Sequence, residues 1–254
     1  ELGFQPLVGA IIAVYLFPRG YQHGFLLIWL VGLIGALAFA RMPLAPQSKA
    51  AATRSARPLW EMGQDVFRDR QLLAFLGIVL AWGLGEQAAR SFYSVHMVRN
   101  LGLDAGIIGL LAAIASLASL VGLPTIGFLS DRYGNRLALL ATGLALALTQ
   151  LGWLGARNAW QLVPIYLLNG LAHRAFQVAM VNLLLAISRP ERYARYSALH
   201  QAAATTTSVV GPLLGAYLFE RVGFASNVTL AAGAGMLAML IAWRFLRERA
   251  PVLK

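Results

Sequence analysis

Long apolar runs alternate with short polar segments along most of this chain. A helix needs about 20 mostly apolar residues to span a membrane, and most of the runs approach or exceed that length. The pattern therefore predicts an all-α polytopic membrane protein with about eight transmembrane helices. The runs cover residues 2–17, which is short for a span, and residues 25–40, 71–98, 105–129, 137–155, 160–187, 197–219 and 226–245.

One polar segment is much longer than the others and divides the chain into regions 1–40, 41–70 and 71–254. It is rich in Pro, Ser and basic residues, which is typical of a linker, and its end favours a short surface helix. The sequence LVGAIIAVYLFPRGY from Leu7 resembles VVGPLLGAYLFERVG from Val209, and each copy is followed by another apolar run. The first two helices therefore repeat the last two. If the repeat is real, we expect the first copy to lack four preceding helices.

Composition narrows the functional classes. The chain is 59% hydrophobic and 12% charged, whereas a soluble domain has about 25% charged residues. The absence of cysteine excludes disulfides, thiol catalysis and cysteine metal sites. The first residues lack a basic segment of the kind that begins a signal peptide.

The net charge of +11 is concentrated in alternate loops. Most basic residues lie in 41–70, 131–136, 188–196 and the C-terminal tail, and few lie in the opposite loops. The positive-inside rule then places the linker and the C-terminus in the cytoplasm, and the chain in the cell membrane. Basic runs interleaved with aromatic residues are not found, so no nucleic-acid partner is expected.

A short charged segment between two apolar runs carries the most specific motif, GFLSDRYGNR at residues 127–136. It resembles the motif A loop of the major facilitator superfamily (MFS), with Ser and Asn at two positions that usually differ. The resemblance implies two six-helix halves joined by a cytoplasmic linker. Residues 1–40 would then be the last two helices of an incomplete N-terminal half, and residues 71–254 the complete second half. The missing N-terminal helices of the same protein would be partners of this chain.

The resemblance also implies that the motif latches the cytoplasmic ends of the two halves in one conformation, with a contact near Glu1. Physically, Gly127 would allow close helix approach, and Gly134 would supply a positive φ in the turn. Asp131 would lie at a helix N-terminus or pair with a neighbouring arginine. The alternative is a plain positive-inside turn. The candidate latch residues are Gly127, Asp131, Arg132, Gly134 and Arg136.

Polar and charged side chains inside two spans predict a solute-binding cavity. An intramembrane charge costs about 2.5–3.5 kcal/mol and therefore usually faces the protein interior or a wet cavity. In the span at 71–98, Glu86 and Arg90 share one helical face and are positioned to pair. In the span at 160–187, polar residues recur every three or four positions. The candidate cavity residues are Glu86, Gln87, Arg90, Tyr166, Asn169, His173, Arg174 and Gln177.

These residues suggest specific roles. We expect the arginines to hold an anionic or polar solute, and Glu86 or His173 to carry a coupling proton. The alternative is structural: Glu86 and Arg90 neutralise each other while His173 bonds a neighbouring helix. In the span at 197–219, His200, Gln201, Thr205 and Ser208 favour core packing. The fifth and eighth runs are nearly free of polar residues, which suits helices that face lipid.

The sequence favours a transporter over an enzyme. No paired metal ligands, paired carboxylates or nucleophile elbow are present, so no catalytic residue, metal or cofactor is expected. The predicted function is secondary active transport of a small solute by alternating access. Proton symport or antiport is the expected source of energy, because no nucleotide-binding motif occurs. The alternative is a truncated, non-transporting scaffold or sensor derived from the same fold.

Overall fold

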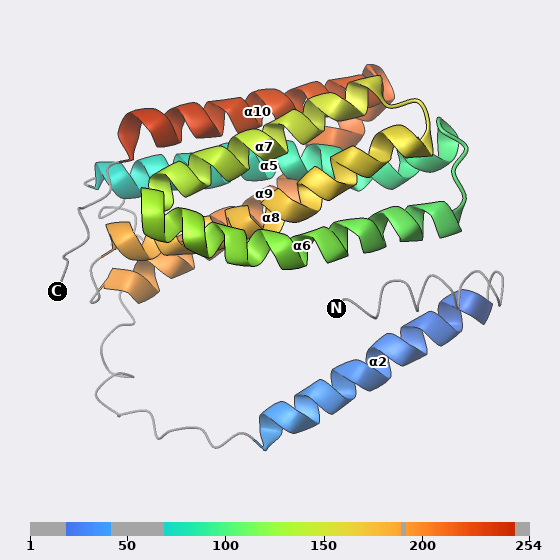
Figure 1. Ribbon diagram of the computed structural model, residues 1–254, viewed down its shortest axis with the longest axis horizontal. Helices are drawn as coiled ribbons and strands as arrows, with labels where there is room; N and C mark the ends of the chain where they lie inside the picture. Colours follow the sequence, from blue (N-terminus) through green and yellow to red (C-terminus); the bar gives the residue numbers. More distant parts are fainter. Residues whose placement is uncertain (1–18, 42–68, 189–191, 247–254) are drawn as a thin grey trace. The chain divides into compact units, whose positions relative to one another are not determined.

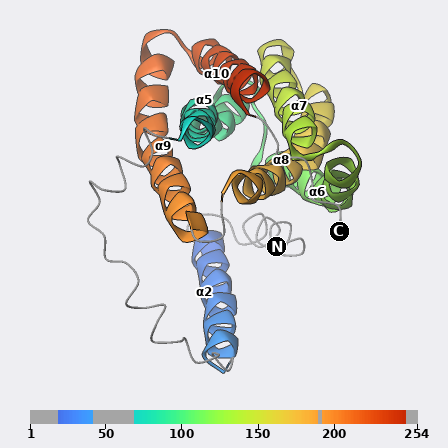
Figure 2. The ribbon, with the colours of Figure 1, turned by 90° about the vertical axis from the view of Figure 1, so that its left-hand side faces the viewer.

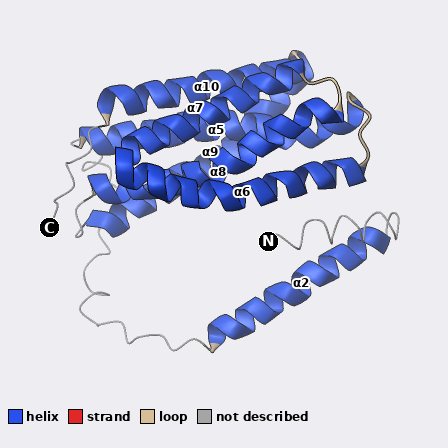
Figure 3. Ribbon diagram, viewed as in Figure 1, coloured by secondary structure: helices blue, strands red, loops and turns tan. Residues whose placement is uncertain are grey.

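The computed structural model describes residues 19–41, 69–188 and 192–246. All regular secondary structure in these residues is α-helix, as predicted (Figure 3). The chain divides into two units, Glu1–Asp65 and Val66–Lys254, and the division falls inside the segment predicted to be a linker. The run at residues 2–17, the latch contact near Glu1 and the first copy of the repeat up to Phe17 lie outside the described residues.

In the first unit, the described helix is α2, Arg19–Ala40. Its apolar stretch is Phe25–Ala38, and large side chains such as Phe25, Trp29 and Ile34 are exposed. A helix that is apolar on every side suits lipid or a protein interior rather than water. This agrees with the second predicted span at residues 25–40.

The second unit contains six helices that are long and apolar enough to cross a membrane (Figure 1). Their positions match the last six predicted runs, although two helices extend further into the polar loops. The helix predicted at 105–129 continues to Tyr133, and the helix predicted at 197–219 already begins at Tyr193. The helices are α5 (Arg70–Arg99), α6 (Ala105–Tyr133), α7 (Asn135–Gly155), α8 (Ala159–Ile187), α9 (Tyr193–Arg221) and α10 (Phe224–Phe245).

Polar caps and glycines end the helices where the apolar pattern stops. Asp69 caps α5 by accepting hydrogen bonds from the backbone amides of Gln71 and Leu72. Asp104 and Asn158 cap the first turns of α6 and α8 in the same way. Successive helices run in opposite directions because the loops between them are short. Each helix therefore ends at the end of the bundle where the next helix begins.

The packing of the six helices has an internal two-fold pattern (Figure 2). Helix α5 packs against α9 and α10, and α8 packs in the equivalent way against α6 and α7. Helix α7 in turn packs against α10. The contacts are therefore preserved when α5, α6 and α7 are exchanged with α8, α9 and α10, as in two repeats of three helices each.

Glycines allow the closest of these helix contacts. A Cβ at Gly170 of α8 would collide with the backbone of Ala115 on α6, and one at Gly215 of α9 would collide with the backbone of Ala88 on α5. Close backbone approach through small residues is the usual way to pack helices in lipid, where apolar burial alone provides little driving force. Two equivalent seams, α6–α8 and α5–α9, are built in this way.

Two apolar clusters fill the unit. The larger one includes Phe75, Ile78 and Phe176, and Trp82 of α5 lies against Phe176 of α8 with ring centroids 4.4 Å apart. The second cluster surrounds Trp153 near the opposite end of the helices. The polar candidates on α5 and α8 therefore lie between two packed layers.

The prediction that the fifth and eighth runs face lipid is wrong at two of their polar side chains, Gln150 and Asn227. Gln150 of α7 is 3% exposed and Asn227 of α10 is 0% exposed. Asn227 donates hydrogen bonds of 3.0 Å to the backbone oxygens of Ala88 and Gly215, and so joins α10 to α5 and α9. Within this unit, α6 and α9 are instead the helices with the largest exposed share.

Candidate solute and proton site between two helices

The candidate site lies where α5 and α8 carry ionisable side chains at the same depth. Glu86 is on the face of α5 that also carries the buried residues Trp82 and Ala89. His173 lies on α8 between the buried residues Ala172 and Phe176. Both side chains project from regular helix interiors, so the surrounding packed residues fix their positions.

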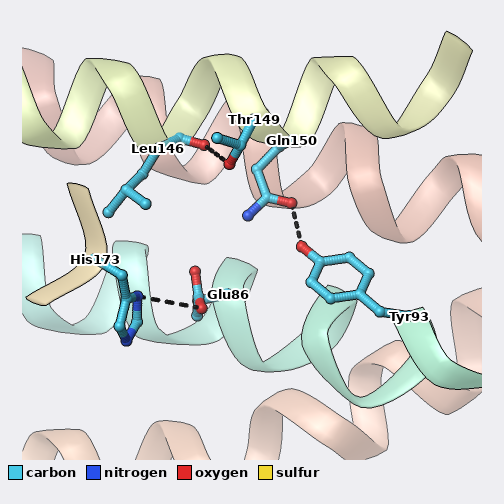
Figure 4. A network of polar contacts seen from close by, with 6 residues as sticks. All are labelled: Glu86, Tyr93, Leu146, Thr149, Gln150 and His173. Carbon is cyan, nitrogen blue, oxygen red and sulfur yellow. Dashed lines mark hydrogen bonds and ion pairs between the residues drawn. The ribbon is translucent and has the colours of Figure 1, made fainter. Parts of the chain in front are cut away.

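Glu86 and His173 point toward one another across the α5–α8 contact (Figure 4). Nδ1 of His173 lies 3.9 Å from Oε1 of Glu86, and the side chains are 23% and 11% exposed, respectively. This separation makes an ion pair when the imidazole is protonated, and it is too long for a direct hydrogen bond. The sequence placed both residues in the cavity without predicting that they face each other.

Two buried atoms of this pair lack a hydrogen-bond partner in the described part of the chain. They are Oε2 of Glu86 and Nδ1 of His173. Buried polar atoms are nearly always paired, and an unpaired one costs about 1–3 kcal/mol. A proton on one of these groups, or a polar group placed between them, would relieve this cost.

The predicted pairing of Glu86 with Arg90 is wrong in detail. The two residues share a helix face and interact electrostatically, but they form no ion pair within 4.0 Å, and Arg90 is exposed. The longer arginine side chain turns toward the open side of α5 while the shorter glutamate remains packed inside. The structural alternative in which these two charges neutralise each other is thereby weakened.

The other candidates are divided between the open face and the interior. Arg174 and Gln177 of α8 are exposed, and Asn169 is half-buried. Gln87 turns to α9, where its Nε2 donates to Oγ of Ser208 at 3.0 Å. Tyr166 is half-buried, and its hydroxyl lies 3.5 Å from Sδ of Met97. The eight candidates therefore do not form one cluster, although most of them lie on the α5 and α8 surfaces.

Core packing is only partly the role of the polar face of α9, although Ser208 does bond its own helix at the oxygen of Ala204, as expected for a hydroxyl in a membrane helix. Gln201, Thr205 and Ser208 are exposed. His200 is half-buried and meets the ring of Phe75 edge-on at 5.4 Å. Thr207 is buried, and its hydroxyl bonds its own helix at the oxygen of Ala204. The polar side chains of α9 are therefore divided between exposed and packed positions.

Tyr93, which is half-buried, and Gln150, which is buried, form a polar contact that the sequence reasoning missed. The hydroxyl of Tyr93 on α5 donates to Oε1 of Gln150 on α7, on the same side of α5 as Glu86 (Figure 4). Tyr93 also stacks on Trp153 with ring centroids 4.4 Å apart. Gln150 was recognisable by the argument used for Glu86, because a polar residue inside an apolar helix usually has a protein partner. Tyr93 gave no such signal.

The motif at residues 127–136 differs from expectation in two residues. Helix α6 continues to Tyr133, so Asp131 lies in the last turn of a helix and not at an N-terminus. Asp131 is exposed and makes no ion pair with either neighbouring arginine in the described residues. A Cβ at Gly127 would meet nothing within 4 Å, so the close helix approach expected there is not found among those residues.

Other features of the motif match the expected turn. Gly134 alone separates α6 from α7 and has a φ of 86°, which strongly favours glycine. Arg136 donates to the backbone oxygen of Trp243 near the end of α10, where a positive charge complements the helix dipole. The guanidinium of Arg132 lies 5.8 Å from the ring of Phe128 and 5.5 Å from that of Tyr133.

A family model named Major Facilitator Superfamily matches residues 83–254. The chain belongs to the major facilitator superfamily. The match runs from within α5 through α10 and includes the Glu86–His173 pair and the motif at residues 127–136. Membership in this superfamily agrees with the paired three-helix repeats and with the glycine-mediated helix seams.

Individual relatives in the MFS were also found. The multidrug resistance protein MdtG of Salmonella paratyphi B, of Salmonella newport and of Salmonella typhi are each 27% identical to this chain over 159 residues. The aligned part covers 63% of this chain and 39% of each relative. The chain thus matches less than half the length of these proteins.

Proposed function

We propose that this chain is part of a secondary active transporter that moves a small solute across the membrane by alternating access. The observation that supports this most directly is the half-buried Glu86–His173 pair between two membrane-length helices, with buried polar atoms that lack a partner among the described residues. A purely structural helix contact would satisfy these atoms or replace them with apolar groups. The superfamily and the names of the Salmonella relatives point to the same class of activity.

Protons are the proposed energy source, with Glu86 and His173 as the proton-carrying residues. A carboxyl group and an imidazole within 4 Å titrate as a coupled pair, because a change of charge on one alters the energy of the other. The solute would occupy the open side of α5 and α8, next to Arg90, Arg174 and Gln177. Two arginines at this surface favour an anionic solute.

The motif at residues 127–136 is proposed to latch the basic end of this unit in one conformation. Exposed Asp131 and Arg132 are available for a contact outside the unit, and Gly134 sets the angle between α6 and α7. The excess of basic residues at this end favours a cytoplasmic location for it. We therefore place residues 41–70 and the C-terminus in the cytoplasm of a cell whose membrane holds this protein.

Proton coupling is tested with the complete protein in proteoliposomes that contain a pH-sensitive dye. A solute is first selected by thermal-shift screening, in which Arg174→Ala should reduce the stabilisation by the solute. Wild-type protein should then move protons when that solute is added, and Glu86→Gln should remove the dependence of uptake on pH. Glu220→Gln is the matched control, because Glu220 is exposed in the last turn of α9. Unchanged pH dependence in Glu86→Gln would exclude this carboxyl as the proton carrier.

The same experiment separates a transporter from a non-transporting scaffold or sensor. A scaffold would show neither solute flux nor proton movement, although a sensor would still be stabilised by its ligand. Transport without proton movement would support the proposed transporter function and contradict only the proposal that protons are the coupling ion.

A further inference from the structure

We infer that, at this site, proton binding and anion binding reinforce each other, so that the protein carries a permanently anionic solute together with a proton. The inference rests on the proposed function and adds the charge class of the solute and the sign of the coupling. It follows from the way the described charges are distributed over α5 and α8.

Positive and negative charges are segregated by depth in the site. Arg90 and Arg174 are exposed on the open faces of α5 and α8. The acidic residue of the site, Glu86, is 11% exposed and turned toward His173. A solute that approaches the open faces therefore meets guanidinium groups, while the carboxylate is withdrawn behind them. Guanidinium groups bind carboxylate, sulfonate and phosphate oxygens, often in bidentate geometry.

The proton-carrying pair lies within electrostatic reach of these arginines. Both Arg90 and Arg174 interact electrostatically with His173, and Arg90 also interacts with Glu86. Whether a proton is added to the glutamate or to the histidine, the charge of the pair rises by one unit. A proton on His173 is therefore repelled by both arginines and a proton on Glu86 by Arg90, and the low local dielectric between packed helices strengthens the repulsion.

The remaining helices packed around Glu86 contribute no further charge there among the described residues. Helix α7 presents Gln150 and Thr149, which are neutral, and α10 presents Asn227. Helix α9 presents Ser208 through its bond to Gln87, with His200 lying nearer the basic end, against Phe75. The phenols of Tyr93 and Tyr166 are neutral at ordinary pH, and His96 lies in the last turn of α5, stacked on Phe224. Among the described residues, the charged groups assigned to the site are thus the two arginines and the proton-carrying pair.

A bound anion changes this balance in one direction. Its charge offsets that of the arginines, so the repulsion against a proton on the Glu86–His173 pair is reduced. By thermodynamic reciprocity, the protonated pair also binds the anion more tightly. A cationic solute would have the opposite effect, since it would add to the positive charge and compete with the proton. The charge pattern therefore predicts co-transport for anions and exchange for cations.

The test uses probes whose own charge does not vary with pH. A panel of arenesulfonates is compared with matched benzyl quaternary ammonium ions, and the affinity of the complete protein is measured by thermal shift and calorimetry at about pH 5.5 and about pH 8. Sulfonate binding should be about tenfold tighter at the lower pH, which lies within the usual range of coupling between two sites. Quaternary ammonium binding should be absent or weaker at the lower pH.

Variants assign the effect to the named charges. Arg90→Gln should weaken sulfonate binding and reduce its dependence on pH, whereas Arg99→Gln, at the exposed end of the same helix, should change neither. The double variant Glu86→Gln with His173→Gln should still bind sulfonate, with affinity independent of pH. These variants are compared at matched melting temperatures, so that a folding defect is not taken for a binding defect.

The inference is overturned if no sulfonate binds, if sulfonate affinity rises with pH, or if the pH dependence survives in the double variant. Those outcomes do not overturn the proposed function when the protein still transports a neutral or cationic solute. Conversely, tighter sulfonate binding at low pH without any flux in proteoliposomes would support the charge coupling and reject transport. The two proposals therefore fail in different experiments.

Discussion

The hydroxyl of Tyr196 donates a hydrogen bond of 2.6 Å to Oδ2 of Asp69. This bond joins the first turn of α9 to the N-terminal cap of α5, two segments that are far apart in the sequence. Asp69 simultaneously accepts from the amides of Gln71 and Leu72 through its other oxygen. One carboxylate therefore begins α5 and holds α9 beside it, at the end of the bundle where the basic loops lie.

The first prediction concerns the pH dependence of this contact. Partial burial alone would raise the pKa of Asp69, but hydrogen bonds from Tyr196, Leu72 and Gln71, together with the charge of Arg192, lower the pKa below its ordinary value. A lowered pKa means that the folded state favours the carboxylate. The resulting stability is present above the ordinary Asp pKa of about 3.9 and is lost as the pH falls through the folded-state pKa.

Asp69→Ala should therefore lower the free energy of unfolding at pH 7 by about 0.5–2 kcal/mol, the usual effect of losing an N-cap. Asp69→Asn keeps a capping oxygen and should lose less. The difference between wild type and Asp69→Ala should shrink as the pH falls below about 4. Melting temperatures in detergent across this pH range measure the effect, and a difference that grows toward acid pH would contradict it.

The second prediction concerns Asn227. Its amide donates to backbone oxygens on two other helices, and such interhelical bonds contribute about 0.6 kcal/mol on average within membranes. Asn227→Leu should lower the free energy of unfolding by about 1 kcal/mol for the two bonds. Thr229→Val is the control, because Thr229 is exposed and bonds only its own helix. Equal effects of the two substitutions, measured by unfolding in mixed detergent, would contradict the assigned role.

The third prediction compares two glycines of the motif at residues 127–136. Gly134 has a φ of 86° and a ψ of 157°, a conformation in which a side chain costs about 1–3 kcal/mol. Gly134→Ala should destabilise the protein by about that amount. Gly127→Ala should be neutral or stabilising, since the helix has open space there and alanine favours helix by about 1 kcal/mol over glycine. The melting temperatures of the two variants measure this difference. A greater loss of stability in Gly127→Ala than in Gly134→Ala would mean that Gly127 holds a close helix contact.

The fourth prediction concerns the seam between α6 and α8. A Cβ on Gly170 would overlap the backbone of Ala115, whereas one on Gly233 of α10 would meet nothing within 4 Å. Gly170→Ala should destabilise the protein by about 1–3 kcal/mol, which is typical of overpacking. Gly233→Ala serves as the control and should not destabilise it. Thermal unfolding of the two variants measures the difference, and similar melting temperatures would argue against close contact at this seam.

The fifth prediction concerns Tyr93 and Gln150. Tyr93→Phe leaves the buried amide oxygen of Gln150 without its partner, at a cost of about 1–3 kcal/mol. Adding Gln150→Leu removes the unpaired group, so the double variant should lose less stability than the sum of the single variants. A double-mutant cycle of unfolding free energies measures this coupling. Additive losses would mean that the two side chains do not interact.

Local features of the sequence were enough to predict most helix positions. The apolar runs located six helices of the described unit, because membrane spans require long uninterrupted apolar stretches. The positive φ of Gly134 was likewise predictable, since the chain reverses there within a few residues. The ends were less predictable at Tyr133 and Tyr193, where helix continues into polar sequence and caps decide where it stops.

The direction in which polar side chains point was not determined locally. Glu86 and Arg90 are neighbours on one helix face, yet one packs against His173 of α8 and the other is exposed. Gln150 and Asn227 occur in helices that look lipid-facing, yet both are buried. The partners of these side chains lie on other helices. The residue pattern within one helix does not predict which neighbouring helix a given side chain will face.

The sequence by itself determined the helical class, the number and placement of the spans in the second unit, the basic ends and the residues able to carry charge. These follow from the hydrophobicity and charge of each residue, because apolar residues are stable in the bilayer core and charged residues are stable at its surfaces. Only the tertiary structure decided that Glu86 meets His173, that Asn227 joins three helices, and that Gly170 rather than Gly127 marks a close approach. Those relationships depend on helix rotation and on which helices are neighbours, and they are settled by packing among residues distant in the chain.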